Sequence, residues 1–422
     1  MTKRFIVLTG VAAIMMASGG SQVAAQPYPH YWMSVSTSSQ NMPGMSPEMA
    51  GMASMFGGGS AFGPRRDLVL QLESPRTVTV TPEAFHEIPS ALNMGRRLPL
   101  ITPRQEKPQR HEGEYKPGET EKTRIRMLYY WGCGENIGAG QPRIFDSEKS
   151  KPEEMAHILR GVAPTVQTPP VPHKGWTFGE WPNADERQTV PRDASLVGEH
   201  RIRGNYTVDI PFRLDERRDF MRPVEFTAVQ TTSSGATRFE WKGVPAAIGY
   251  FATAVGSDGK GGDMIMWSAS EVPENGMALM DYLTPGDVHR FIRERIIMDP
   301  ARTSCTVPPI FKDSAGAMLQ FIAYGEQLDI VHPPKPKDPR EFWQPEWAVK
   351  VRLKSTTMAP LGIRGDDGEH RKPRASSRSS KPDSRMSEKE PVDNSYDERR
   401  DPESRRSRGG AVGDALRGVF GF

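Results

Sequence analysis

Five methionines near the N-terminus are the residues whose type and spacing most directly suggest chemistry. They lie three or four positions apart in a stretch rich in Gly, Ser and Pro: Met42, Met45, Met49, Met52 and Met55. Thioether sulfur is a soft ligand that suits Cu(I), so this segment could surround one copper ion. His30 and Glu48 are the other potential ligands nearby. The alternative is a low-complexity linker, or adaptable apolar side chains that contact a partner.

Two groups of aromatic residues beside Gly and Pro are candidates for ligand binding. Trp176, Phe178 and Trp181 form the first group, and Trp343 and Trp347 flank Pro345 in the second. Aromatic rings exposed on the loops of a β-sandwich can stack on the apolar face of a sugar. The alternative is that these rings plug irregular chain segments onto the core.

Cys133 and Cys305 are the only cysteines of the 422-residue chain. An even count in an exported protein permits one disulfide, which would close a loop of about 170 residues. The chain-entropy model credits such a loop with roughly 4–5 kcal/mol of stability. We expect the two Cα atoms to lie within about 7 Å, as a disulfide requires. The alternative is a pair of small buried apolar side chains.

No motif for catalysis or for a cofactor stands out in the sequence. The nine histidines never lie within five positions of one another, which excludes HxH and HExxH metal sites. The run Gly132-Cys133-Gly134 follows a strand-like segment, but a Pro-containing stretch stands where a phosphate-binding helix would begin. GxSxG, phosphate-loop and CxxC motifs are missing as well. We therefore predict no catalytic residue and no cofactor.

The first 25 residues have the pattern of a signal peptide. Lys3 and Arg4 precede an apolar run over residues 5–16, and Val23-Ala24-Ala25 provides small residues before a cleavage site at Gln26. No other stretch approaches the ~18 apolar residues of a membrane span. Removing Lys3 and Arg4 leaves 53 basic and 52 acidic residues, so the charge balance does not favour nucleic acid. We expect a periplasmic or secreted protein without a transmembrane segment.

Short alternating runs predict a mostly β protein with two sandwich-like modules. The first module, residues 64–215, contains strand-like runs around 68–72, 77–80, 124–131 and 205–212, with an irregular Pro- and Trp-rich insert between the last two. The second, residues 222–356, has the densest alternation, over 224–229, 237–241, 248–255 and 263–267, and strand signals return at 318–324 and 348–353, where Val349, Val351 and Leu353 alternate with Lys350 and Arg352. In the second module, Thr284 and Pro285 predict the start of a helix over 285–297. In the first module, residues 150–161 favour another short helix.

One passage of the second module resembles a known family. Phe239-Glu240-Trp241, Val244-Pro245-Ala246 and Gly249-Tyr250 resemble the strand–turn–strand passage of fibronectin type III and related immunoglobulin-like domains. The resemblance covers about 30 residues and implies an elaborated sandwich, because such domains have no helix like the one expected at 285–297.

The remaining segments are expected to lie outside the folded modules. Residues 26–63 show no period of 2 or 3.6, and residues 357–410 are charged and nearly free of large apolar side chains, so we predict that both are disordered. Val412, Leu416, Val419 and Phe420 share one helical face, which makes residues 411–422 a candidate docking peptide, an inert end or part of the core.

These observations favour a non-catalytic binding or scaffolding protein of the cell envelope, with an envelope protein or polysaccharide as its partner. The first alternative is an enzyme that acts on envelope polysaccharide or cell wall, which would need converging carboxylates or a Cys–His pair. The second is copper binding through Met42 to Met55.

Overall fold

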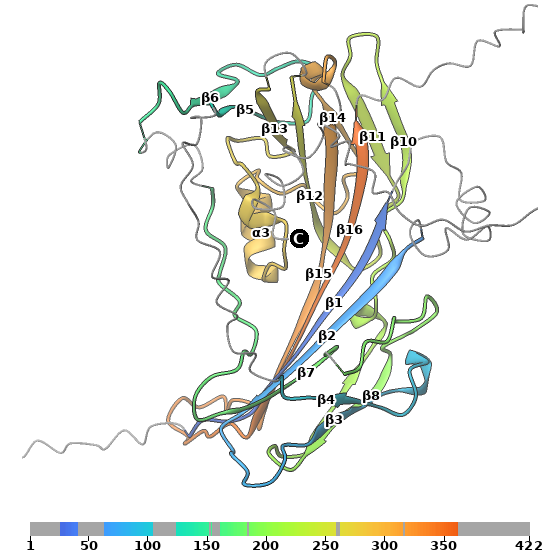
Figure 1. The fold of residues 1–422 in the computed structure, drawn as a ribbon, viewed down its shortest axis with the longest axis vertical. Coiled ribbons are helices and arrows are strands. Elements are labelled where there is room, and N and C mark those ends of the chain that lie inside the picture. The colour runs from blue at the N-terminus through green and yellow to red at the C-terminus, as the bar shows by residue number, and fades with distance from the viewer. Residues whose placement is uncertain are drawn as a thin grey trace, which may run out of the picture. The chain divides into compact units, whose positions relative to one another are not determined.

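The computed structural model describes residues 26–40, 63–103, 124–151, 153, 161–183, 185–258, 262–314 and 317–361 (Figure 1). Its described part is mostly β, with one α-helix and three sheets. Fold class is thus as the sequence predicts. Residues 1–25, the five methionines, most of the second expected helix and the segment 411–422 lie outside the described residues.

A nine-stranded sheet forms the centre of the fold, in the order β6-β5-β13-β12-β15-β16-β1-β2-β7. Its strands are β1 (His30–Gln40), β2 (Arg65–Ser74), β5 (Arg126–Trp131), β6 (Arg143–Asp146), β7 (Thr177–Trp181), β12 (Ala247–Ser257), β13 (Met264–Ser268), β15 (Ala317–His332) and β16 (Trp347–Leu361). The pairs β1–β16 and β13–β5 are parallel, and the other pairs are antiparallel.

Two smaller antiparallel sheets complete the described part. One has the order β4-β3-β8-β9 and the other β10-β11-β14. Their strands are β3 (Ala84–Glu87), β4 (Arg97–Leu100), β8 (Gly198–Gly204), β9 (Ile210–Leu214), β10 (Phe226–Thr231), β11 (Thr237–Trp241) and β14 (Ser304–Val307).

The two modules that the sequence suggests are not separate in the structure. The large sheet takes β2, β5, β6 and β7 from residues 64–215, and β12, β13 and β15 from residues 222–356. Strand β16 continues to Leu361, so the prediction of disorder over 357–410 is wrong for residues 357–361, and the rest of that segment lies outside the described residues. Sequence patterns locate strands but not their partners, and here both parallel pairings join the first half of the chain to the second.

The prediction of disorder over residues 26–63 is wrong for residues 30–40, which form strand β1. This strand lies between β16 and β2, with Tyr31, Met33 and Val35 buried at alternate positions. Its other positions are mostly Ser and Thr, including the buried Ser34 and Thr37. These short polar residues hid an alternating pattern that a Val- or Ile-rich strand would show.

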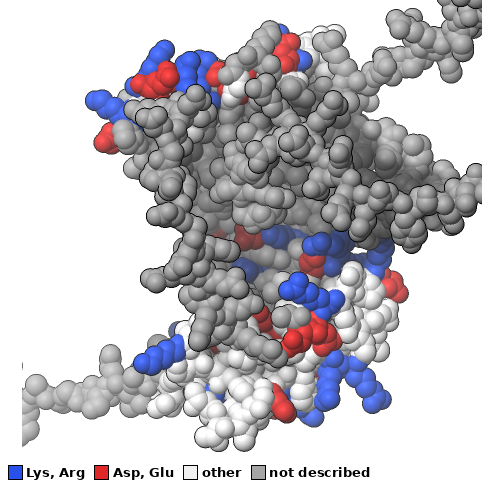
Figure 2. Space-filling model, viewed as in Figure 1, with Lys and Arg blue, Asp and Glu red and all other residues white. Residues whose placement is uncertain are grey.

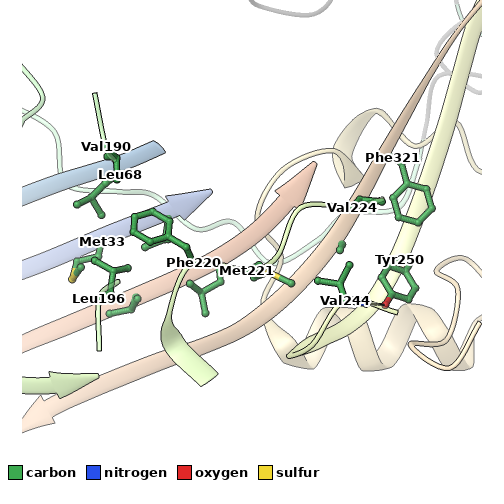
Figure 3. Packing of buried hydrophobic residues seen from close by; sticks show 14 of the residues in the cluster. Met33, Leu68, Val190, Leu196, Phe220, Met221, Val224, Val244, Tyr250 and Phe321 are labelled. Carbon is green, nitrogen blue, oxygen red and sulfur yellow. Dashed lines mark hydrogen bonds between the residues drawn. The ribbon is translucent and has the colours of Figure 1, made fainter. Parts of the chain in front are cut away.

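The two faces of the large sheet are covered by different layers. On one face, Tyr31 contacts Phe212 of β9, and Phe321 of β15 contacts Phe239 of β11, with ring centroids 6.1 and 6.2 Å apart. Both small sheets therefore pack on this face and share one apolar core with it. Figure 3 shows part of that core, where Met33 and Leu68 lie close to Leu196 and Phe220.

Helix α3 (Pro285–Arg293) covers part of the opposite face (Figure 1). The Thr284 side chain accepts a hydrogen bond from the Asp287 backbone N–H, as a helix cap does. Phe291 is fully buried against Ile322 and Phe251 of the sheet. A Cβ on Gly249 would lie 2.8 Å from Val288 Cγ1, so only glycine lets α3 approach β12 this closely.

The helix ends four residues before the predicted end at 297. Glu294 caps it, and Arg295 adopts a left-handed conformation with φ 63°. Ile296 and Ile297 are still buried in the same apolar cluster, which explains why they prolong the helical pattern in the sequence. Among the described residues, no helix is long and apolar enough to cross a membrane.

The passage that resembles fibronectin type III domains forms β11, a turn and β12. These two strands belong to different sheets, β11 to the three-stranded sheet and β12 to the large one. The arrangement of sheets is sandwich-like, and membership of the immunoglobulin or fibronectin families stays a prediction.

Candidate functional site

A row of alternating cationic and aromatic side chains lies on the face of the large sheet that carries α3. Lys350, Arg352 and Lys354 occupy alternate positions of β16, opposite Trp32, Ser34 and Ser36 of β1. Tyr282 reaches the same row from the loop before α3. We call Lys350, Trp32, Arg352, Tyr282 and Lys354 the cation–aromatic row.

The distances within the row are those of cation–π contacts. The Arg352 guanidinium carbon lies 5.3 Å from the Trp32 ring centroid and 4.3 Å from that of Tyr282. Lys350 Nζ lies 5.2 Å from the Trp32 centroid, and Lys354 Nζ lies 4.4 Å from the Tyr282 centroid. All five side chains are half-buried, so the polar face of β16 is less exposed than its alternating pattern suggests.

The charges of the row are compensated unequally. Lys350 pairs with Asp329, and Lys354 pairs with Asp281 at 2.7 Å. Arg352 belongs to none of the ion pairs of the described residues, and only its Nε donates, to Ser34 Oγ at 2.8 Å. Burial lowers the pKa of Arg352, although it remains a permanent cation. Arg352 is therefore a partly desolvated guanidinium whose two Nη groups bond no described residue.

A Pro-rich segment, residues 162–176, crosses this same face and is called the strap here. It is tied to the region of α3 at one end and to β2 at the other. The bonds are from Val162 N to Glu274 Oε2 (2.7 Å), from Thr165 N to Asp287 Oδ2 (2.8 Å) and from Gln71 Nε2 to Pro170 O (3.2 Å). Gln71 is paired directly with Trp32, so the strap reaches β2 one strand away from the row.

Two glutamines on this face carry buried polar atoms without a partner. Gln167 lies on the strap between its two attachment points, and neither its Oε1 nor its Nε2 has a hydrogen-bond partner. Gln327 is paired with Arg352 across β15 and β16, and its Oε1 also lacks a partner. An unmade hydrogen bond of this kind costs about 1–3 kcal/mol. A polar ligand would recover that free energy if these buried side chains turned to meet it.

The five aromatic candidates from the sequence have different surroundings. Phe178, Trp181 and Trp347 are buried at 3%, 1% and 6% exposure, so they are core residues and not exposed stacking rings. Trp343 is half-buried, and its indole N–H donates to Pro333 O at 2.9 Å. These four fit the alternative in which aromatic rings plug irregular segments onto the core.

Trp176 is the half-buried member of the two that line a cavity, Phe178 being the buried one. Trp176 immediately precedes β7, with its ring centroid 4.9 Å from that of His173 and 6.4 Å from that of His30. A cavity of about 740 Å³ is lined here by Pro82, Thr102, Pro103, Pro172, His173, Lys174, Trp176, Thr177 and Phe178. Trp176 thus stays a candidate for contact with a ligand, at the end of the strap.

A buried chain of hydrogen bonds joins two histidines that the sequence keeps 114 residues apart. Tyr31 Oη lies 2.8 Å from His86 Nδ1, His86 Nε2 lies 2.9 Å from His200 Nδ1, and His200 Nε2 lies 2.7 Å from Leu196 O. A carbonyl only accepts, so His200 Nε2 carries a proton, His86 Nε2 donates to His200 Nδ1, and Tyr31 donates to His86.

His86 and His200 are both neutral in this series of hydrogen bonds. Burial lowers the pKa of His86 well below its usual value, and the neighbouring His200 lowers it further. Burial also lowers the pKa of His200. The pair is sealed in the core at 0% and 1% exposure, so it serves the fold and not a ligand. No group of metal-binding side chains occurs among the residues that the structure describes.

The predicted disulfide is confirmed. Cys133, just after β5, is bonded to Cys305 of β14, with Cα atoms 5.1 Å apart. The bridge joins the large sheet to the three-stranded sheet, and the Gly134 N–H donates to Thr306 O beside it at 2.8 Å.

Sequence reasoning missed the cation–aromatic row because its members come from three distant segments of the chain, with Trp32 318 positions before Lys350 and Tyr282 68 positions before it. The alternation of Lys350 and Arg352 in a strand was visible, but nothing marked Trp32 or Tyr282 as their neighbours. Comparison with protein-family models, with curated proteins and with solved structures finds no match for this chain.

Proposed function

We propose that the protein is exported to the cell envelope and acts there as a non-catalytic binding protein. Its binding surface is the sheet face between α3 and the strap, and its ligand is an envelope polysaccharide. The observation that carries this proposal is Arg352, a half-buried cation without an ion pair among the described residues, held between two aromatic rings. Asp281, which pairs with Lys354, acts on Arg352 only from beyond ion-pair distance, and a partly desolvated charge without a direct partner is costly.

Other features support this proposal. Figure 2 shows basic and acidic side chains interspersed on the visible face, which suits a polar ligand better than the polyanionic backbone of nucleic acid. The disulfide supports export, because such bonds persist in oxidising compartments. It also leaves neither cysteine as a free thiol nucleophile for the alternative, an envelope enzyme. Copper binding at Met42 to Met55 remains a separate hypothesis outside the described residues.

Export is tested by following the mature N-terminus. We expect protein recovered from the periplasm of a Gram-negative host to begin at Gln26. Gln26 contacts the loop that precedes β16. Its N–H donates to Gln344 Oε1 and its carbonyl accepts from Gln344 Nε2, both at 2.9 Å. N-terminal sequencing of a cytoplasmic product that starts at Met1 would contradict export.

Ligand binding is tested on an array of bacterial cell-wall and capsular oligosaccharides. We expect the mature protein to bind a subset of them and Trp32→Ala to lose that binding, because Trp32 holds two cations of the row. Phe342→Ala, at a residue 74% exposed and outside the row, is the matched control and should bind normally. Absence of any bound glycan, or unchanged binding by Trp32→Ala, would contradict the proposal. Loss of binding in Trp176→Ala, with normal binding in Trp32→Ala, would show that the glycan binds at the cavity lined by Trp176 and not at the row.

A further inference from the structure

The cation–aromatic row also indicates the chemical class of the ligand. We propose that the sheet face between α3 and the strap binds acidic sugars, with Arg352 holding the carboxylate of a uronic-acid residue. This inference rests on the proposed function and specifies which polysaccharides the protein prefers.

The charge requirement follows from the row itself. Lys350 and Lys354 already have carboxylate partners, whereas Arg352 has none among the described residues. Its Nε donates a hydrogen bond to Ser34 Oγ, and its planar guanidinium makes cation–π contacts with Trp32 and with Tyr282. The two Nη groups remain to donate in parallel, which matches the two oxygens of a carboxylate. One cation without a direct ion pair among the described residues fits a single negative charge per site.

The requirement for hydroxyl groups follows from the glutamines. Gln327 Oε1 lacks a donor, and Gln167 lacks both a donor and an acceptor. A hydroxyl group can donate and accept, so sugar hydroxyls beside the carboxylate would satisfy these buried amides once their side chains turn toward the ligand. Simple carboxylic acids offer the charge without these groups, and neutral sugars offer the hydroxyls without the charge.

The aromatic rings of Trp32 and Tyr282 contribute to ligand binding mainly by holding the cations of the row in place. Lysine or arginine nitrogens already lie over both rings of the row, which leaves less ring surface for stacking on a neutral pyranose. Charge recognition by Arg352 is therefore the main source of selectivity.

The test compares oligogalacturonate with its methyl ester, which has the same backbone and hydroxyls without the charge. Isothermal titration of the mature protein with oligogalacturonate, oligomannuronate and oligoglucuronate should detect binding of at least one, and methyl esterification should weaken it at least tenfold. Arg352→Gln should weaken binding of the acid about 10- to 100-fold, the worth of a charge-assisted bidentate contact. Arg352→Lys should recover part of the loss, because charge returns without the planar fork.

Arg340→Gln is the matched control, because its side chain is 89% exposed in a loop away from the row. It should bind as the wild type does. Equal binding of acid and ester, or no binding of any of the three acids, would overturn the acidic-sugar inference. If neutral glycans then bind and Trp32→Ala abolishes that binding, the proposed function stands without this inference. The ester comparison uses the wild-type protein, so it holds even if an Arg352 variant folds poorly.

Discussion

Replacing both cysteines, as Cys133→Ala and Cys305→Ala together, should lower the free energy of unfolding by about 5 kcal/mol. The bridge spans a sequence separation of 172 residues, and a loop of that length removes a corresponding entropy from the unfolded chain. Urea denaturation followed by tryptophan fluorescence measures the difference. The effect is large because the loop that the bridge closes is long.

Reduction of the wild-type protein provides the control for this variant. Its unfolding midpoint in the presence of reductant should match that of the double variant, since Ala and a reduced thiol leave the same open chain. A loss below about 1 kcal/mol in both would mean that the unfolded chain is already restricted and that the loop-entropy account is wrong here.

The buried Tyr31–His86–His200 chain should make the fold sensitive to acid. Burial lowers the pKa of both histidines in the folded protein, so below about pH 6.5 the unfolded chain binds protons that the folded protein does not. Stability is therefore full above the unfolded pKa and falls as the pH drops through it. Each histidine contributes at most about 1.4 kcal/mol per pH unit, and the two together at most about 2.7, over the range in which the unfolded chain is protonated and the folded protein is not. Urea midpoints between pH 7.5 and 4.5 measure this slope.

The double variant His86→Leu and His200→Leu isolates the cause of the slope. It should be less stable at pH 7.5, because Tyr31 and Leu196 O lose their partners, and its stability should fall much less steeply with acid. The exposed His289 gives the control, since His289→Gln should leave the wild-type slope unchanged. A slope that persists in the double variant would place the acid sensitivity elsewhere, for example at the half-buried His30, whose pKa is also lowered by burial.

Local patterns in the sequence predicted the elements whose signals are local. Thr284 and Pro285 marked the start of α3, because a cap and a first-turn proline act within a few residues. The alternating run around Val349 to Leu353 marked β16, whose buried and half-buried positions do alternate. The even cysteine count, together with the signal-peptide pattern of the first 25 residues, was enough to predict the disulfide.

Features that depend on contacts between distant segments were missed. Strand β1 was read as disorder because serines and threonines fill its polar positions, and its pairing with β16 joins residues 318 positions apart, such as Ser34 and Arg352. The same pairing creates the cation–aromatic row. Without strand β1, neither the arrangement of the nine-stranded sheet nor the candidate site could be predicted. Phe178 and Trp181 were misjudged for a related reason. Glycine and proline beside them suggested a loop, but strand pairing with β2 places both in the core.

The most direct test of the central claim is nuclear magnetic resonance of the ¹⁵N-labelled mature protein titrated with oligogalacturonate. The Trp32 indole N–H and the Arg352 Nε–H signals, assigned with Trp32→Phe and Arg352→Lys, report the row itself. We predict that these signals, and those of the strap around Gln167, shift first and saturate together. Shifts confined to Trp176 and His173, or no shift in the row at saturating glycan, would contradict a binding site on this face of the sheet.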